Sequence, residues 1–136
     1  KLRITVLDSL NDFDLIFEEI RKVAINISGV GPLLVYDTAL RYAFHRGIYP
    51  NYVYICSSAG PLAGAKSFFE IIGKNKIKLS SGKYVDRDKL KVICKIDKSE
   101  FTYLNAYSCL HIENIMCNYH NELEILSYIA YHIEND

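Results

Sequence analysis

The chain has no tryptophan, no net charge and no long apolar run. A membrane-spanning helix needs about 20 consecutive apolar residues, and no stretch of these 136 residues approaches that length. No hydrophobic segment with a small-residue cleavage site follows the N-terminus, so a secretory signal is not expected. We therefore expect a soluble, cytoplasmic protein that has no membrane partner.

The cysteines lack the spacing of a disulfide framework. All four stand among apolar neighbours, which is typical of reduced, buried thiols: Cys56, Cys94, Cys109 and Cys117. The pairs Cys109-x-His111 and Cys117-x-x-His120 place four zinc-binding side chains within twelve residues, though not at a standard spacing. We predict no bound metal and no cofactor, and a zinc site on these four residues is the alternative.

Catalytic motifs are also absent. The four histidines are scattered, none lies in a nucleophile motif, and no two carboxylates form a recognised acid-base pair. We therefore name no catalytic residue, and an enzyme is the less favoured class of protein.

Half of the residues are hydrophobic, which is enough for one domain with a buried core over residues 1–136. The predicted fold is mainly α, a small helical domain with a helix-hairpin-helix-like pair and a short β hairpin. Its helical core covers about residues 11–73, a basic segment containing the β hairpin covers 74–98, and acidic C-terminal helices cover 99–136.

The helical core rests on apolar periodicity. Apolar residues recur at helical spacing over residues 13–27, and Asn11 or Asp12 can cap this helix. A second helix is predicted from Pro32 to about Arg46, with Gly47 as its stop. The predicted buried stripe of the second helix is Leu33, Tyr36, Leu40, Ala43 and Phe44.

The remaining part of the N-terminal half is less regular. Leu2, Ile4 and Val6 alternate with polar residues, which predicts a short strand or extended arm. Residues 52–56 fit a strand or an extended link. A third helix is predicted over residues 61–72, closed by a glycine at position 73.

The C-terminal half combines strands and helices. Residues 77–85 predict a small hairpin, and residues 90–96 could add a strand. A short helix is expected over residues 101–107. The last helix should run over 108–133, with a break near 118–121, because its apolar positions outnumber those of one narrow stripe.

Charge is unevenly distributed although it sums to zero. Residues 74–98 carry nine Lys or Arg against three Asp, and residues 99–136 carry six acids and no Lys or Arg. A basic surface followed by an acidic segment fits a nucleic-acid-binding protein. The other interpretation is that the two segments neutralise each other within the fold or across a dimer.

The turn between the first two predicted helices contains Gly29, Val30 and Gly31. Such a turn brings backbone N–H groups and a helix N-terminus to one point, where phosphate oxygens can bind. Two helices joined by Gly-hydrophobic-Gly resemble the helix-hairpin-helix motif of DNA repair and replication proteins. The resemblance implies that these three residues give N–H groups to duplex phosphates without reading sequence. A plain helical corner, in which the glycines serve only the turn, is the alternative.

A wider stretch is similar to a family of small uncharacterised bacterial proteins. The resemblance is carried by residues 29–41, by Val53-Tyr54 through Ala59-Gly60 to Gly64-Ala65-Lys66, and by residues 112–117. It supports the fold and the extent of the domain and implies no activity.

The pattern Ser-x-x-Gly-Pro-Leu occurs twice, at residues 28–33 and 57–62. The second copy predicts another turn that opens a helix, with Gly60 in the place of Gly31. Residues 60–67 also follow the spacing of a phosphate loop superficially, but Ala65 stands at the second required glycine.

Two functions are therefore predicted. The first is non-sequence-specific binding of nucleic-acid backbone, with DNA as the expected nucleic acid. The alternative is a protein-interaction or regulatory module, whose acidic C-terminal helix engages a protein partner or a second copy of the chain. The candidate nucleic-acid-binding residues are Gly29, Val30, Gly31, Arg41, Arg46, Gly60, Lys66 and Lys74.

Overall fold

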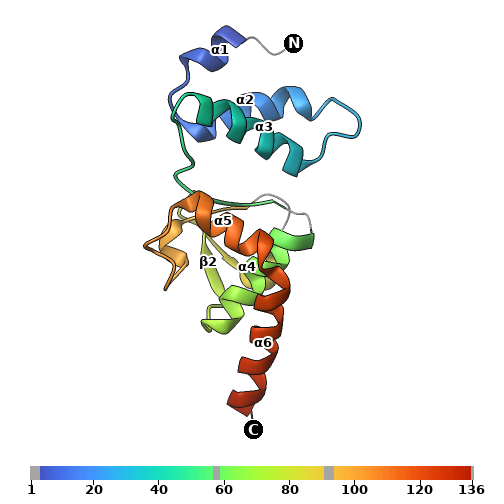
Figure 1. Ribbon diagram of the computed structural model, residues 1–136, viewed down its shortest axis with the longest axis vertical. Coiled ribbons are helices and arrows are strands. Elements are labelled where there is room, and N and C mark those ends of the chain that lie inside the picture. The colour runs from blue at the N-terminus through green and yellow to red at the C-terminus, as the bar shows by residue number, and fades with distance from the viewer. Residues whose placement is uncertain (1–3, 57–58, 91–93, 136) are drawn as a thin grey trace. The chain divides into compact units, whose positions relative to one another are not determined.

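The computed structural model describes residues 4–56, 59–90 and 94–135. The chain is mainly α-helical, with six α-helices and two pairs of short strands among these residues, so the predicted fold class is confirmed (Figure 1). Its contacts group into two compact units, residues 1–51 and 52–136. Folding of residues 1–136 as one domain stays a prediction.

The first unit contains α1 (Ile4–Ser9), α2 (Phe13–Ala24) and α3 (Pro32–His45). Asp12 caps α2, and its side chain accepts the N–H of Leu15 at 3.2 Å. Pro32 is the first residue of α3, and Gly47 follows its end with a φ of +68°. Both predicted helices are present: α3 has the predicted bounds to within one residue, whereas α2 ends at Ala24, three residues before the predicted end.

The predicted N-terminal strand is wrong. Leu2 lies outside the described residues, while Ile4 and Val6 lie exposed on the short helix α1, whose buried residue is Leu7. An alternation of three residues is too short to separate a strand from one exposed helical turn. The side chain of Arg46, which follows the last residue of α3, binds α1.

The core of the first unit lies between α2 and α3. The ring of Phe13 stacks on Phe17 and meets Tyr36 edge-on. The predicted stripe of α3 is partly wrong: Tyr36 and Ala43 are buried, but Leu33 and Phe44 are exposed. The residues that α3 buries are Val35, Tyr36, Ala39 and Ala43. Two of these four buried residues are alanines, which occupy little volume in the core.

The second unit contains two antiparallel strand pairs. β2 (Lys76–Lys78) pairs with β3 (Tyr84–Asp86), which confirms the predicted hairpin. β1 (Val53–Ile55) pairs with β4 (Cys94–Ile96), so both of the less certain strands are present, and residues 91–93 lie outside the described part. β1 is fully buried, as its unbroken apolar run suggests.

Three helices complete the second unit: α4 (Ala59–Ile71), α5 (Cys109–Asn118) and α6 (His120–Asn135). The break between α5 and α6 lies at Tyr119, within the predicted range. The predicted short helix over residues 101–107 is wrong. A 3₁₀ turn, η2 (Lys98–Glu100), precedes this stretch, and residues 101–107 form irregular turns in which Tyr103 adopts a φ of +71°.

α4 packs against both α5 and α6, and in Figure 1 the last turns of α6 extend beyond the other elements of this unit. The crossing of α4 and α5 is very close: a Cβ added at Gly64 would lie 2.1 Å from the carbonyl oxygen of Met116. The core beneath includes Phe68, Phe69 and Phe101. A second 3₁₀ turn, η1 (Arg87–Lys89), contacts α4.

Candidate functional site

The turn between α2 and α3 meets the phosphate hypothesis in part, because the N–H of Val30, one of the three predicted donors, is already used within the turn. Gly29 adopts a φ of +85°, which glycine accepts without strain. The N–H of Val30 donates to the carbonyl of Ile27 at 3.2 Å. The N–H groups of Leu33 and Leu34, in the first turn of α3, have no partner among the described residues. Two backbone donors therefore face outward at the positive end of the α3 dipole.

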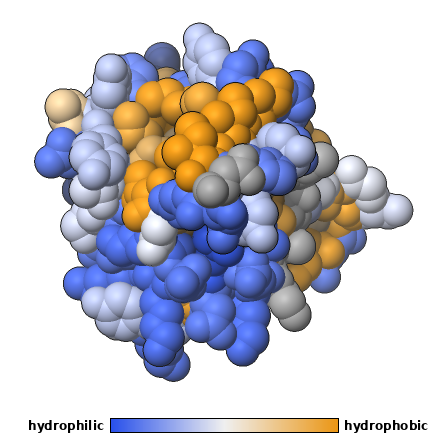
Figure 2. Space-filling model, turned by 90° about the horizontal axis from the view of Figure 1, so that it is seen from below, coloured by the Kyte–Doolittle hydropathy of each residue, from blue (hydrophilic) through white to orange (hydrophobic). Residues whose placement is uncertain are grey.

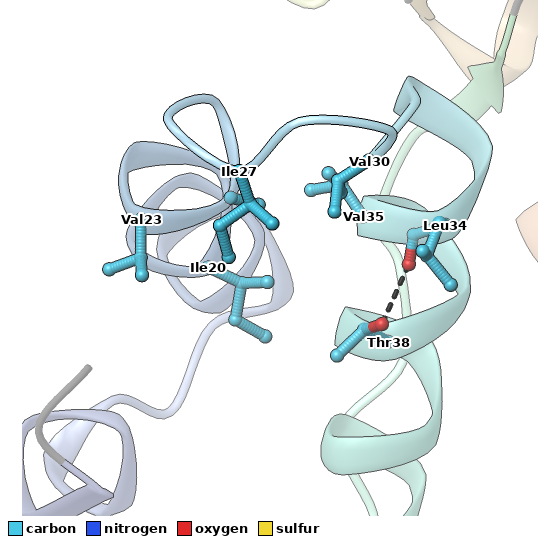
Figure 3. Close-up of a pocket in the computed structure, with 8 residues that line it drawn as sticks. Ile20, Val23, Ile27, Val30, Leu34, Val35 and Thr38 are labelled. Atoms are coloured by element: carbon cyan, nitrogen blue, oxygen red, sulfur yellow. Dashed lines mark hydrogen bonds between the residues drawn. The ribbon is translucent and has the colours of Figure 1, made fainter. Parts of the chain in front are cut away.

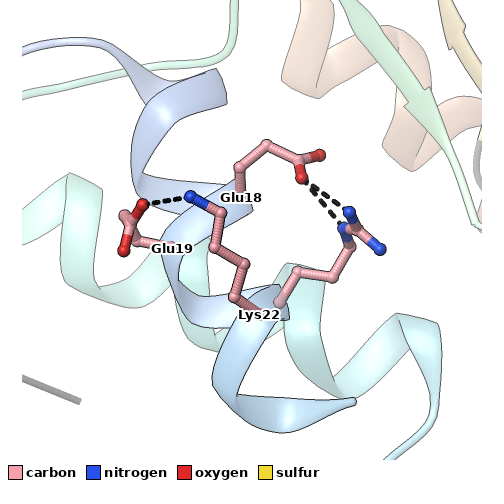
Figure 4. Close-up of polar contacts among 4 residues, drawn as sticks. Glu18, Glu19 and Lys22 are labelled. Carbon is pink, nitrogen blue, oxygen red and sulfur yellow. Dashed lines mark hydrogen bonds and ion pairs between the residues drawn. The ribbon is translucent and has the colours of Figure 1, made fainter.

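The basic residues of α2 closest to this turn are paired with glutamates of the same helix. The guanidinium of Arg21 lies 2.9 Å from the carboxylate of Glu18, and the ammonium of Lys22 lies 2.5 Å from that of Glu19 (Figure 4). Exposed pairs of this kind add little stability. They do cancel one another's charge, so they leave no excess of positive charge beside the turn.

Arg41 and Arg46 are separated from the turn along α3. Arg41 is exposed, and with a rise of 1.5 Å per residue it lies about 14 Å along the axis from Pro32. The guanidinium of Arg46 donates to the carbonyls of Leu7 at 2.8 Å and Leu10 at 2.7 Å. Arg46 thus binds carbonyl groups at the C-terminal end of α1, where a cation is favourable.

A second contact to α1 comes from Tyr42, whose hydroxyl donates to the carboxylate of Asp8. Partial burial, together with this hydrogen bond and the negative charge of Asp8, raises the pKa of Tyr42 above its usual value. The guanidinium of Arg46 also lies over the Tyr42 ring, 5.8 Å from its centroid. Tyr42 and Arg46 therefore act together in holding α1 against α3.

Gly60, Lys66 and Lys74 belong to the second unit. Gly60 lies within the first turn of α4, which begins at Ala59, so the predicted turn before this helix is wrong; Ser57 and Ser58 lie outside the described residues. Residues 60–67 are helical and form no phosphate loop. Lys66 reaches the carbonyl of Asp88 at 3.4 Å.

Lys74 has a structural partner. Its ammonium lies 3.0 Å from the carboxylate of Glu100, a buried residue. The two groups form an ion pair. They do not form a hydrogen bond, because the Lys74 ammonium is not aligned as a donor to Glu100 Oε2. A buried carboxylate needs such a counter-charge. The charge of Lys74 is therefore used within the fold.

The cysteine and histidine residues near the C-terminus do not gather into a ligand set. Among the described residues, no three His, Cys, Asp or Glu side chains are placed to hold a metal ion. Cys109 is a free, buried thiol whose pKa is raised by burial, so it is protonated at neutral pH. The Nδ1 atom of His120 lies 2.8 Å from the carbonyl oxygen of Cys117.

An apolar groove of about 250 Å³ lies between α2 and α3, beside the glycine turn (Figure 3). Its one polar side chain, Thr38, donates its hydroxyl to the carbonyl of Leu34 at 2.7 Å. Val23 and Ile27 belong to the apolar residues that recur at helical spacing over residues 13–27, yet Val23 is half-buried and Ile27 is exposed. The residues lining the groove are Ile20, Val23, Ala24, Ile27, Val30, Leu34, Val35 and Thr38.

The outer side of α6 carries an apolar face that was not predicted from the sequence. Ile125, Leu126, Ile129 and Ile133 are exposed by 60%, 52%, 45% and 74%. Figure 2, which views the molecule from the end at which α6 terminates, shows a large group of apolar side chains on the surface and a smaller group apart from it. The sequence does indicate this face, because residues 108–133 contain more apolar positions than one buried stripe needs. The additional apolar residues of α6 form a second face, which is exposed.

A polar groove of about 410 Å³ runs between α4 and α6. The hydroxyl of Ser127, a buried residue, donates to Glu70 at 2.7 Å at its base. The ring of His132 lies 4.3 Å from that of Tyr128 and 5.5 Å from that of Tyr131. The lining residues are Ser67, Glu70, Glu124, Ser127, Tyr128, Tyr131 and His132.

Comparisons with family models, curated proteins and solved structures found no match for the chain. In the described part of the chain, no helix combines the length and the apolar character needed to cross a membrane. Functional residues can therefore be inferred only from the surfaces and grooves of the two units.

Proposed function

We propose that the chain is a protein-interaction module that binds a helical segment of a partner through α6. The observation that supports this function is the exposed apolar face formed by Ile125, Leu126, Ile129 and Ile133. Three of these side chains recur every four residues, which is the spacing by which one helix packs along another. Large apolar side chains grouped on one exposed face are typical of an interaction surface.

The opposite side of α6 packs against α4, and this packing favours a higher affinity for a partner. α6 packs on α4, and Ser127 of α6 is buried against Glu70. A partner therefore meets a helix that is already formed and does not have to order it. Burying one Leu or Ile side chain contributes about 1.5–3 kcal/mol, so two or three such contacts can offset part of the cost of association.

The function can be tested without a known partner by selecting peptides from a displayed library of helical 14-residue sequences on the whole chain. We expect the selected peptides to share apolar residues at helical spacing, and Ile129→Glu to weaken their binding at least tenfold, because a carboxylate would be placed at the centre of the interface. Ile25→Glu is the matched control, since Ile25 is also exposed but belongs to the first unit.

Two results would count against this function. The library could give no peptide that binds above background, or the selected peptides could bind Ile129→Glu as tightly as the unchanged chain. Loss of binding by Ile25→Glu to the same extent would move the interaction surface away from α6.

Binding of nucleic-acid backbone is the second candidate. It is supported by the N–H groups of Leu33 and Leu34 beside the glycine turn. We expect labelled duplex DNA to bind with an affinity that falls at least tenfold when the salt concentration rises from about 50 to about 200 mM. The reason is that binding to phosphates releases counterions, and added salt opposes this release. Gly31→Val should weaken binding further, since a side chain there meets nothing within 4 Å and would only obstruct a ligand. No binding at the lower salt concentration would remove this candidate.

A further inference from the structure

We infer that the groove between α4 and α6 receives a Lys or Arg side chain of the partner helix; this rests on the proposed function of α6. The groove adjoins the apolar face. Glu124 and Tyr128 line it and also line a neighbouring hollow of about 300 Å³ that includes Ile125. A helix packed on Ile125 is therefore within a side chain's length of the groove.

The two carboxylates of the groove, Glu70 and Glu124, differ in whether they already have hydrogen-bond or ion-pair partners. Glu70 accepts the hydroxyl of Ser127 at 2.7 Å and has the guanidinium of Arg87 at 4.0 Å. Glu124 is exposed and has no hydrogen-bond or ion-pair partner among the described residues. Glu124 is thus the carboxylate that is able to receive a cation from outside.

The aromatic rings favour the same ligand chemistry. Tyr128 and Tyr131 line the groove together with Glu124. The faces of tyrosine rings attract Lys and Arg through their quadrupole, and a nearby carboxylate adds a direct charge interaction. A side chain with a long apolar stem and a cationic end fits a groove whose mouth borders an apolar face.

Charge also distinguishes among possible occupants of the α6 surface. α6 carries Glu122, Glu124 and Glu134, and its sequence contains no Lys or Arg. Two copies packed through α6 would bring carboxylates together without a Lys or Arg on either helix to pair with them. A helix that presents apolar residues flanked by Lys or Arg complements both features of the surface.

The test uses three synthetic helical peptides that share the same leucines and differ only at the flanking positions, which are Lys, Gln or Glu. Binding to the whole chain is measured by fluorescence anisotropy. We expect the Lys peptide to bind at least tenfold tighter than the Gln peptide, and the Glu peptide to bind weakest. Glu124→Gln should remove most of the preference for Lys while leaving the affinity for the Gln peptide nearly unchanged.

Glu134→Gln is the matched control, because it removes the same charge from α6 outside the groove. Equal binding of the Lys and Gln peptides would overturn the inference and leave the proposed function standing. A preference for Lys that survives Glu124→Gln would also overturn it. If none of the peptides binds, the proposed function fails as well. Sedimentation of the unchanged chain and of Ile129→Glu tests the remaining alternative. If the unchanged chain is a dimer and Ile129→Glu is a monomer, the α6 surface binds a second copy of the chain, and the inference is overturned.

Discussion

Gly64→Ala is expected to lower the free energy of unfolding of the second unit by at least about 3 kcal/mol, the upper part of the usual range for overpacking. The added Cβ would lie 2.1 Å from the carbonyl oxygen and 2.9 Å from the carbonyl carbon of Met116. Both atoms are backbone of α5, so no side-chain rotation relieves the overlap. α4 and α5 would have to move apart, and the buried contacts of Ile112 and Met116 with α4 would be weakened.

The measurement is urea unfolding of the whole chain followed by circular dichroism, with hydrogen exchange of α4 and α5 to locate the change. Gly60→Ala is the matched control in the same helix. A Cβ at Gly60 would lie 3.3 Å from a ring atom of His120, which can shift, and alanine is the better helix former by about 1 kcal/mol. We expect the control to change stability by no more than about 1 kcal/mol. Equal stability of the two variants would contradict the close crossing at Gly64.

The sequence predicts elements well where local signals agree. For α2, the cap at Asp12 and the apolar spacing from Phe13 to Ile20 point to the same start and the same buried face, and the structure has both. The hairpin of β2 and β3 follows in the same way from two short apolar segments around a Ser-Ser-Gly turn. These signals lie within a few residues, so they need no knowledge of tertiary contacts.

Elements fixed by distant contacts were not predicted. α1 is held by Arg46 and Tyr42, which lie more than 30 residues away in the sequence. Arg46 stands near the end of an amphipathic helix, where an exposed cation is the ordinary expectation. The sequence gives no sign that carbonyl groups of another helix will surround it.

The sequence indicates the exposed apolar face of α6 only in part. The excess of apolar residues over one stripe predicts a break at residues 118–121, and the structure has this break at Tyr119. It did not show which residues of α6 contact α4 and which face outward, because Leu123 and Ile125 have the same chemical character. Leu123 packs against the core, and Ile125 is exposed. The direction of a helical face depends on its neighbour in space, which periodicity alone does not specify.

Phe101→Ala is expected to cost about 3–5 kcal/mol, the usual range for removing a buried phenylalanine. Phe101 is fully buried, and its ring lies 5.7 Å from that of Phe68 and 5.0 Å from that of Phe69. The substitution leaves a cavity beneath α4 and removes both ring contacts, which themselves stabilise beyond their buried area. At about 4–8 °C per kcal/mol for a unit of this size, the melting temperature should fall by more than about 12 °C.

Phe44→Ala is the matched control, because it makes the same chemical change at an exposed ring. Among the aromatic side chains described, the Phe44 ring contacts only that of Tyr49. We expect it to cost no more than about 1.5 kcal/mol. Similar losses for both variants in thermal unfolding would show that Phe101 is not a core residue. A large loss for Phe101→Ala alone would show that Phe101 is a main anchor of the irregular segment after η2, from which Leu104 also packs against the core.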